Sequence, residues 1–130
     1  MSAFDTTRGR IFVLGGNASN RHLYTLSSNA WSAVTLSGAN ASNVSSAEQD
    51  TMVYVAAIDR FLIRQGGAGG TVYQVNASTF EVTTFATTDG ASIPSTQNGP
   101  YNKFLYVPRL RGAVYVPSYP GNAWFLRVHP

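Results

Sequence analysis

The 130-residue chain contains no cysteine, which excludes disulfides, thiolate–metal sites and cysteine nucleophiles. Histidine is nearly absent too: His22 and His129 are the only two, and no carboxylate stands at metal-ligand spacing from either. The chain has neither a G-x-S-x-G motif nor a phosphate loop followed by Lys-Ser/Thr. The sequence therefore predicts a protein that is not an enzyme and that uses no metal or other cofactor.

Charge is also scarce. Charged residues make up 12% of the chain, and eight arginines and one lysine oppose six acids for a net charge of +3. Nucleic-acid-binding proteins carry denser basic patches, so we expect no nucleic-acid partner. No apolar stretch is long enough to span a membrane, and residues 1–10 lack the apolar region of a signal peptide. The compartment is left open by these observations.

The polar positions are filled by Ser, Thr, Asn and Gly, which suit turns and the open faces of sheets. No long segment has the 3.6-residue period of an amphipathic helix, so the sequence predicts an all-β fold with almost no helix. Short apolar runs recur instead. "IFVLGG" (11–16) is followed 51 residues later by "LIRQGG" (62–67), and "MVYVAAIDRFL" (52–62) matches "FLYVPRLRGAV" (104–114) at a spacing of 52.

These matches divide one domain, 1–130, into three units, 1–38, 39–90 and 91–130, each made of four strand-like segments. The predicted strands are 2–7, 10–14, 22–27 and 31–36; then 51–58, 61–65, 71–76 and 80–85; then 102–110, 113–117 and 123–128. The first two strands of a unit are nearly continuous apolar runs, as expected when both faces are covered. Repeats of this length with four strands indicate β-propeller blades, here two full blades and an incomplete third.

The segment "RIFVLGG", followed by an aromatic residue in the third strand and a Trp or Phe opening the fourth, resembles the kelch repeat of galactose-oxidase-like propellers. The matching positions are Gly15, Gly16, Tyr24 and Trp31, then Gly66, Gly67, Tyr73 and Phe80. The third unit departs from the pattern, with Ser118-Tyr119 in place of the Gly pair. The resemblance implies the fold alone, because the copper site of the galactose oxidases needs a Cys–Tyr crosslink and His ligands that this chain lacks.

Two and a half blades cannot close a ring, since propellers have about four to eight. Two explanations are open: a second chain completes a six-bladed ring, or the chain is a piece of a longer propeller. We expect the first, and therefore a homodimer, because apolar blade faces left bare call for a partner.

Long Asn-rich connections gather on one face of such a propeller, where loops on a rigid scaffold commonly bind ligands. The candidate ligand-binding residues are Asn20, His22, Asn98, Tyr119, Asn122 and Trp124. They suit a glycan or a polar protein surface, although Asn and Ser also simply make good loops. The opposite face collects Arg8, Arg10, Arg60, Arg109 and Arg111, which we expect to be solvated turn charges balanced by Asp5 and Asp59.

Arg64 and Gln65 interrupt an apolar run where a covered strand is expected. A buried arginine must be paired and hydrogen-bonded, so this pair marks a central channel or a contact between chains. Together these patterns predict a non-catalytic propeller scaffold or binding module. The alternatives are a lectin-like carbohydrate binder, or a fragment of a larger kelch-type or virion structural protein.

Overall fold

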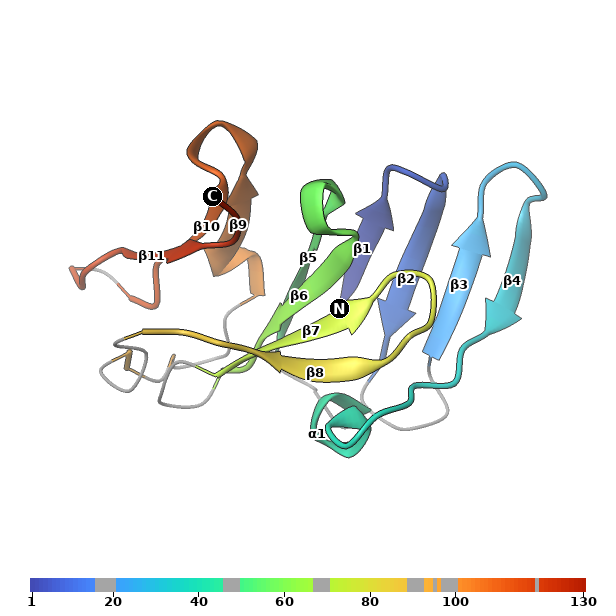
Figure 1. Ribbon diagram of the computed structural model, residues 1–130, viewed down its shortest axis with the longest axis horizontal. Coiled ribbons are helices and arrows are strands. Elements are labelled where there is room, and N and C mark those ends of the chain that lie inside the picture. The colour runs from blue at the N-terminus through green and yellow to red at the C-terminus, as the bar shows by residue number, and fades with distance from the viewer. Residues whose placement is uncertain are drawn as a thin grey trace.

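A computed structural model of the protein describes residues 1–15, 21–45, 50–66, 71–88, 93–94, 96, 101–118 and 120–130. The predicted all-β class is confirmed: the described residues form three antiparallel sheets that follow one another along the chain (Figure 1). Each sheet is a meander of consecutive strands, and the sheets do not close into a ring.

The strands lie where the repeat predicted them. The first sheet has the order β1 (Ser2–Asp5), β2 (Arg10–Leu14), β3 (Arg21–Thr25), β4 (Ala30–Ala33). The second has the order β5 (Thr51–Val55), β6 (Arg60–Arg64), β7 (Val72–Asn76), β8 (Val82–Phe85). The third pairs β9 (Phe104–Val107) with β10 (Gly112–Tyr115), and β10 with β11 (Trp124–Arg127).

The short helical elements shorten two of the predicted strands. The strands predicted at 51–58 and 102–110 end early in the 3₁₀ turns η1 (Ala56–Ile58) and η4 (Pro108–Leu110). Each turn is followed by a residue with positive φ, Asp59 at 52° and Arg111 at 53°, which reverses the chain into the next strand. A further 3₁₀ turn, η3 (Tyr101–Lys103), precedes β9, and a one-turn helix, α1 (Ala41–Ser45), lies in the connection that was predicted as a loop.

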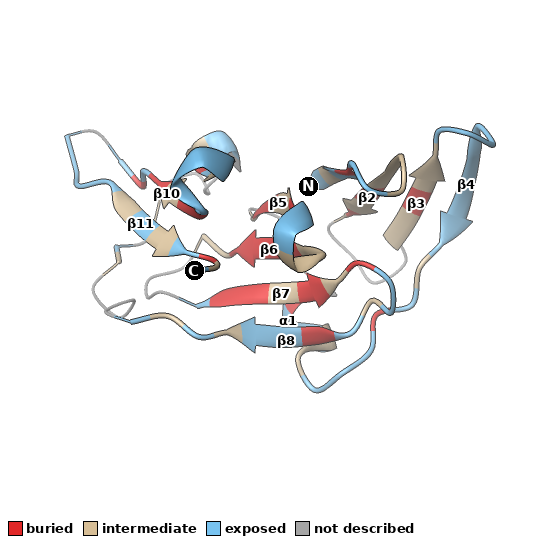
Figure 2. Ribbon diagram, turned by 45° about the horizontal axis from the view of Figure 1, so that its top comes forward, coloured by how far each residue is buried: buried red, intermediate tan, exposed pale blue. Residues whose placement is uncertain are grey.

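The first strands of the sheets are neighbours, with β1 against β5 and β5 against β9. The second sheet lies between the other two, and its strands β6 and β7 are largely buried (Figure 2). β4, at the far edge of the first sheet, is exposed along its whole length. The exposure of β4 and of most of β8 agrees with the polar sequence of the fourth segment of a unit. The first strand is not the most buried, since Ser2 and Phe4 of β1 are exposed and β6 is more buried than β5.

The side chains of β6 point alternately to the two faces of the second sheet, and both faces are covered, which explains why its sequence is continuously apolar. Phe61 and Ile63 belong to a core shared with the first sheet, where the Phe61 and Phe12 rings are 5.0 Å apart between centroids. Leu62 belongs to a second core shared with the third sheet, together with Phe104. Both faces of the second sheet are therefore covered, as the predicted strand pattern requires.

The connection after β4 covers part of the first core with two apolar side chains. Leu36 and Val44 are buried in it, and Ser37 pairs in parallel with Glu81 through backbone hydrogen bonds to Phe80 and Val82. Phe80 was predicted to open a strand, but it has a φ of 58° and lies in the turn before β8, where its ring packs on Phe12.

Charged side chains join the first two sheets at their turns, in what we call the arginine–aspartate cluster: Asp5, Arg8, Arg10 and Asp59. Arg8 donates two hydrogen bonds to Asp59, at 2.7 and 2.6 Å, and a third to Asp5 at 3.1 Å. Asp5 is fully buried and also accepts from Arg10 Nε at 2.9 Å. The sequence indicated that Asp5 and Asp59 balance these arginines. The predicted solvation of the arginines holds for Arg109 and Arg111, which are exposed, whereas Arg8 and Arg10 are partly buried against the fully buried Asp5.

Gly112 allows the Phe125 ring to lie across β10. A Cβ at this position would come within 2.5 Å of the Leu126 carbonyl oxygen and would overlap the ring of Phe125. We expect Gly112→Ala to lower the free energy of unfolding by about 1–3 kcal/mol, measured by urea denaturation. In the control Gly9→Ala, the new methyl meets nothing within 4 Å, so only its positive φ costs stability, about 1 kcal/mol. An unchanged Gly112→Ala midpoint would contradict this packing.

Candidate functional site

The outer face of the first sheet carries a bare apolar row. The strand register places Phe4 beside Ile11, Ile11 beside Tyr24, and Tyr24 beside Trp31. Phe4 and Trp31 are 46% and 62% exposed, and the Tyr24 and Trp31 rings are 5.0 Å apart between centroids. Ile11 and Tyr24 between them are partly buried, and a contiguous apolar row with exposed ends is typical of an interaction surface.

The outer face of the third sheet carries a second bare row. Here Leu105 pairs with Val114, which pairs with Phe125, and the first and last of these are 58% and 53% exposed. The two rows therefore lie at opposite ends of the three-sheet stack.

Each bare row has a buried counterpart inside the molecule. In the second sheet the row equivalent to that of the first sheet is Tyr54, Phe61, Val75 and Val82, and it packs against the first sheet. The row equivalent to that of the third sheet is Val53, Leu62 and Gln74. Val53 and Leu62 pack against the third sheet, whereas the position equivalent to Phe125 holds the polar Gln74, which is outside this core. The end faces are thus the same kind of surface that the chain already buries twice.

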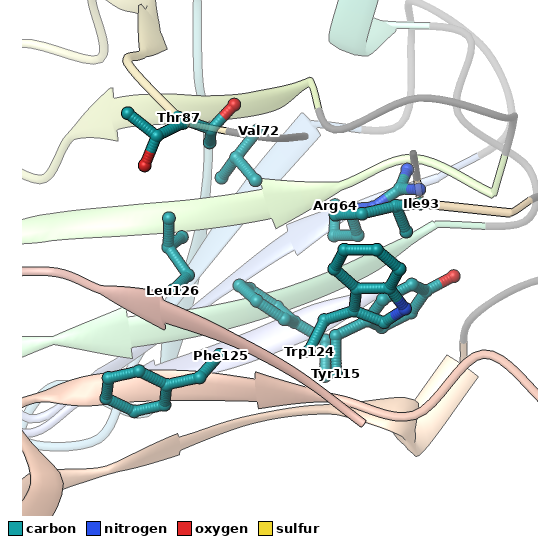
Figure 3. Close-up of a pocket in the computed structure, with 10 residues that line it drawn as sticks. Arg64, Val72, Thr87, Ile93, Tyr115, Trp124, Phe125 and Leu126 are labelled. Carbon is teal, nitrogen blue, oxygen red and sulfur yellow. The ribbon is translucent and has the colours of Figure 1, made fainter. Parts of the chain in front are cut away.

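A small pocket with a cavity volume of about 50 Å³ lies between the second and third sheets and opens to solvent (Figure 3). Strand ends build it: Arg64 ends β6, Tyr115 ends β10, and Trp124 begins β11. These ends are on the side of the long connections, which is the face that the sequence predicted for binding. The apolar wall consists of Val72, Ile93, Phe104 and Leu126.

Three polar groups converge in the pocket. The Arg64 side chain is 2% exposed, and its guanidinium carbon lies 4.9 Å from the centre of the Tyr115 ring. Tyr115 is 3% exposed, and within the described part of the chain neither its hydroxyl nor the buried Trp124 Nε1 has a hydrogen-bond partner. Buried donors without acceptors are uncommon and costly, so they mark a place where another group fits.

The electrostatics of Arg64 reflect its position. Burial lowers the pKa of its guanidinium, and the negative charge of Asp50 opposes that change. Burial in turn raises the pKa of Asp50, which accepts a hydrogen bond from the Gly66 backbone at 3.2 Å. Arg64 still carries its positive charge at neutral pH, because guanidinium pKa values lie far above 7.

The predicted binding residues do not all come together. His22 lies in β3, edge-on to Trp31 at 6.3 Å between ring centroids, whereas Trp124 lies in the third sheet and lines the pocket. Asn122 is exposed just before β11. The remaining predicted residues, Asn20, Asn98 and Tyr119, lie outside the described residues.

The side chains of Arg64 and Gln65 have different surroundings. Arg64 enters the pocket, while Gln65 donates from Nε2 to the Asn43 carbonyl at 2.7 Å and so ties β6 to the α1 segment. Arg64 is therefore at a contact between sheets of one chain. Sequence reasoning missed Tyr115, because an aromatic residue in an apolar strand gives no signal that separates it from core.

Among the residues that the structure describes, no three His, Asp or Glu side chains are grouped to hold a metal ion. In the same residues, no helix has the length and apolar character to cross a membrane. Comparisons of the chain with protein-family models, with curated proteins and with solved structures find no match.

Proposed function

We propose that the chain is a non-catalytic β-propeller scaffold and binding module whose three sheets are kelch-like blades. Its bare faces would be covered by a second copy of the chain, giving a six-bladed ring. The observation that carries this proposal is the equivalence of the two bare rows with the two rows buried between neighbouring sheets.

The equivalence also sets the direction of association. Inside the chain, the face that bears Leu62 receives the next sheet, and the face that bears Phe61 receives the preceding one. The bare third-sheet face is of the first kind, and the bare first-sheet face is of the second kind. Packing the third sheet of one copy on the first sheet of another therefore repeats an internal contact, whereas packing two first sheets together does not.

Two such contacts close a ring with two-fold symmetry. Three sheets from each copy give six blades, which is within the usual range of about four to eight. The adjacency of β1, β5 and β9 places the first strands of all three sheets together, as blades around an axis require. The scaffold would then present its long connections, and the pocket beside them, on one face.

Sedimentation at about 100 μM chain is expected to give a species of about 28 kDa, twice the 14.0 kDa of one chain. Trp31→Glu and Phe125→Glu should each weaken association at least tenfold, because a charge would be buried in an apolar contact. Leu110→Glu is the matched control: Leu110 is 57% exposed but lies in the η4 turn, off both faces.

Mixing the two variants tests the direction. Trp31→Glu keeps an intact third sheet and Phe125→Glu keeps an intact first sheet, so the mixture should recover a dimer through one contact. Dimers of Phe125→Glu alone as stable as the wild type would contradict head-to-tail packing. A cooperatively folded monomer at every concentration would refute the dimer and favour a piece of a longer propeller.

A further inference from the structure

We propose that the pocket formed by Arg64, Tyr115 and Trp124 binds the carboxylate of a small organic acid with an apolar body. The pocket lies within one chain, so this inference is independent of whether two copies close a ring. The hydrogen-bond donors in the pocket and the apolar side chains around them determine which ligand fits (Figure 3).

The hydrogen-bond donors of Arg64, Tyr115 and Trp124 favour a ligand group that accepts hydrogen bonds and is negatively charged. Trp124 Nε1 can only donate a hydrogen bond. The guanidinium of Arg64, over the Tyr115 ring at 4.9 Å from its centre, repels any second cation. A ligand oxygen that accepts from Tyr115 and Trp124 would satisfy two groups that have no partner within the described residues. Burial of these groups makes such hydrogen bonds stronger than they would be in water.

The apolar side chains around the donors favour a ligand whose remaining atoms are hydrocarbon. Phe104, Leu126 and Val72 offer apolar surface, and no carboxylate lines the pocket among the described residues. A phosphate or sulfate would leave several oxygens against these hydrocarbon side chains, which is costly. A carboxylate attached to a ring or a short aliphatic chain places its charge at the donors and its body against the wall.

The probe is benzoate, followed by the fluorescence of Trp124 in a Trp31→Phe background, since Trp31 is the only other tryptophan. We expect a saturable change, with a dissociation constant in the range of about 0.1–1 mM for a ligand of this size. Benzyl alcohol, which keeps the ring but lacks the charge, should bind at least tenfold more weakly.

Two variants assign the contacts. Tyr115→Phe keeps the packing and should weaken benzoate about fivefold, and Arg64→Leu should weaken it at least tenfold. Arg109→Leu, at an exposed arginine of the η4 turn, should leave benzoate binding unchanged. Thermal melting checks each fold, and Tyr115→Phe, which loses only a buried hydroxyl, keeps the test valid if Arg64→Leu fails to fold.

A further comparison distinguishes the source of the carboxylate. Tighter binding of N-acetyl-phenylalanine than of benzoate would assign the pocket to the free end of a peptide, and the reverse would assign it to a free acid; either result supports the proposal. No saturable response up to about 20 mM benzoate, an equal response to benzyl alcohol, or an unaffected Tyr115→Phe would overturn it. The pocket would then hold water only.

Discussion

Replacing Phe61 by alanine is expected to lower the free energy of unfolding by about 3–5 kcal/mol. The Phe61 ring is fully buried at the centre of the first core, where it contacts Phe12 at 5.0 Å and Tyr54 at 5.2 Å between ring centroids. Its removal leaves a cavity between two sheets whose backbones are fixed by their own hydrogen bonds, so little of that cavity can collapse.

Urea denaturation measures the Phe61→Ala effect as a lower midpoint with an unchanged slope, because the surface exposed on unfolding stays nearly the same. Since single domains are stable by about 5–15 kcal/mol, a large part of the fold's stability would be lost. Leu26→Ala is the control, at a turn residue that is 49% exposed, and it should cost under about 0.5 kcal/mol. A Phe61→Ala loss no larger than that of Leu26→Ala would contradict a shared core between the sheets.

The strands could be predicted because short apolar runs separated by turn residues are a local signal. The second sheet shows this best: β5, β6 and β7 are read directly from "TMVYV", "RFLIR" and "VYQVN". The 3₁₀ turns could not be separated from the strands before them, because "VAAID" and "VPRLR" continue the apolar run while the backbone already turns at Asp59 and Arg111.

The spacing of the first repeat was off by one residue. Matching "IFVLGG" to "LIRQGG" sets a spacing of 51, but the register pairs Arg10 with Asp5 and Arg60 with Val55, so equivalent positions are 50 apart. A slip of one residue exchanges the two faces of a strand. Arg64 is therefore equivalent to Leu14, which faces the second sheet, and this places Arg64 on the face toward the third.

The candidate site could be predicted only in part. Arg64 stood out because a charge in a covered strand needs an explanation, and Trp124 stood out as an aromatic residue near the long connections. Arg64 lies beside Tyr115 and Trp124 because the second sheet packs on the third, and no local sequence pattern encodes that packing. For the same reason the arginine–aspartate cluster was placed in solvent: its members come from two turns that are distant in sequence and adjacent in space.

Asp5→Asn is expected to cost about 3 kcal/mol at pH 7, because it leaves the Arg10 side chain and part of Arg8 without their buried counter-charge. Asp5 accepts four hydrogen bonds, from the backbone nitrogens of Thr7 and Arg8 and from the side chains of Arg8 and Arg10. Burial acts to raise the pKa of Asp5, but the hydrogen bonds from Arg10 and Arg8 outweigh it and hold that pKa below its usual range. Hydrogen bonds from Arg8 likewise hold the pKa of Asp59 well below its usual range.

The direction of these pKa shifts sets the dependence on pH. A carboxyl whose pKa is lower in the folded state stabilises the fold fully above its unfolded pKa, about 3.9, and loses that contribution as the pH falls through its folded pKa. For Asp5 and Asp59 the free energy of unfolding should therefore fall steadily as the pH drops below about 4. Asp50, whose pKa is raised by burial, acts in the opposite direction and offsets part of this loss.

Urea midpoints measured from pH 7 down to about pH 2 test the cluster as a charged contact between the first two sheets. The stability difference between the wild type and Asp5→Asn should be largest at pH 7 and should shrink as Asp5 of the wild type becomes protonated, because asparagine and a protonated aspartate are similar in shape and charge. Glu81→Gln, at an exposed carboxylate outside the cluster, should cost under about 0.5 kcal/mol at every pH. If Asp5→Asn costs no more than Glu81→Gln, or costs the same at pH 2 as at pH 7, the charge of Asp5 does not hold the two sheets together.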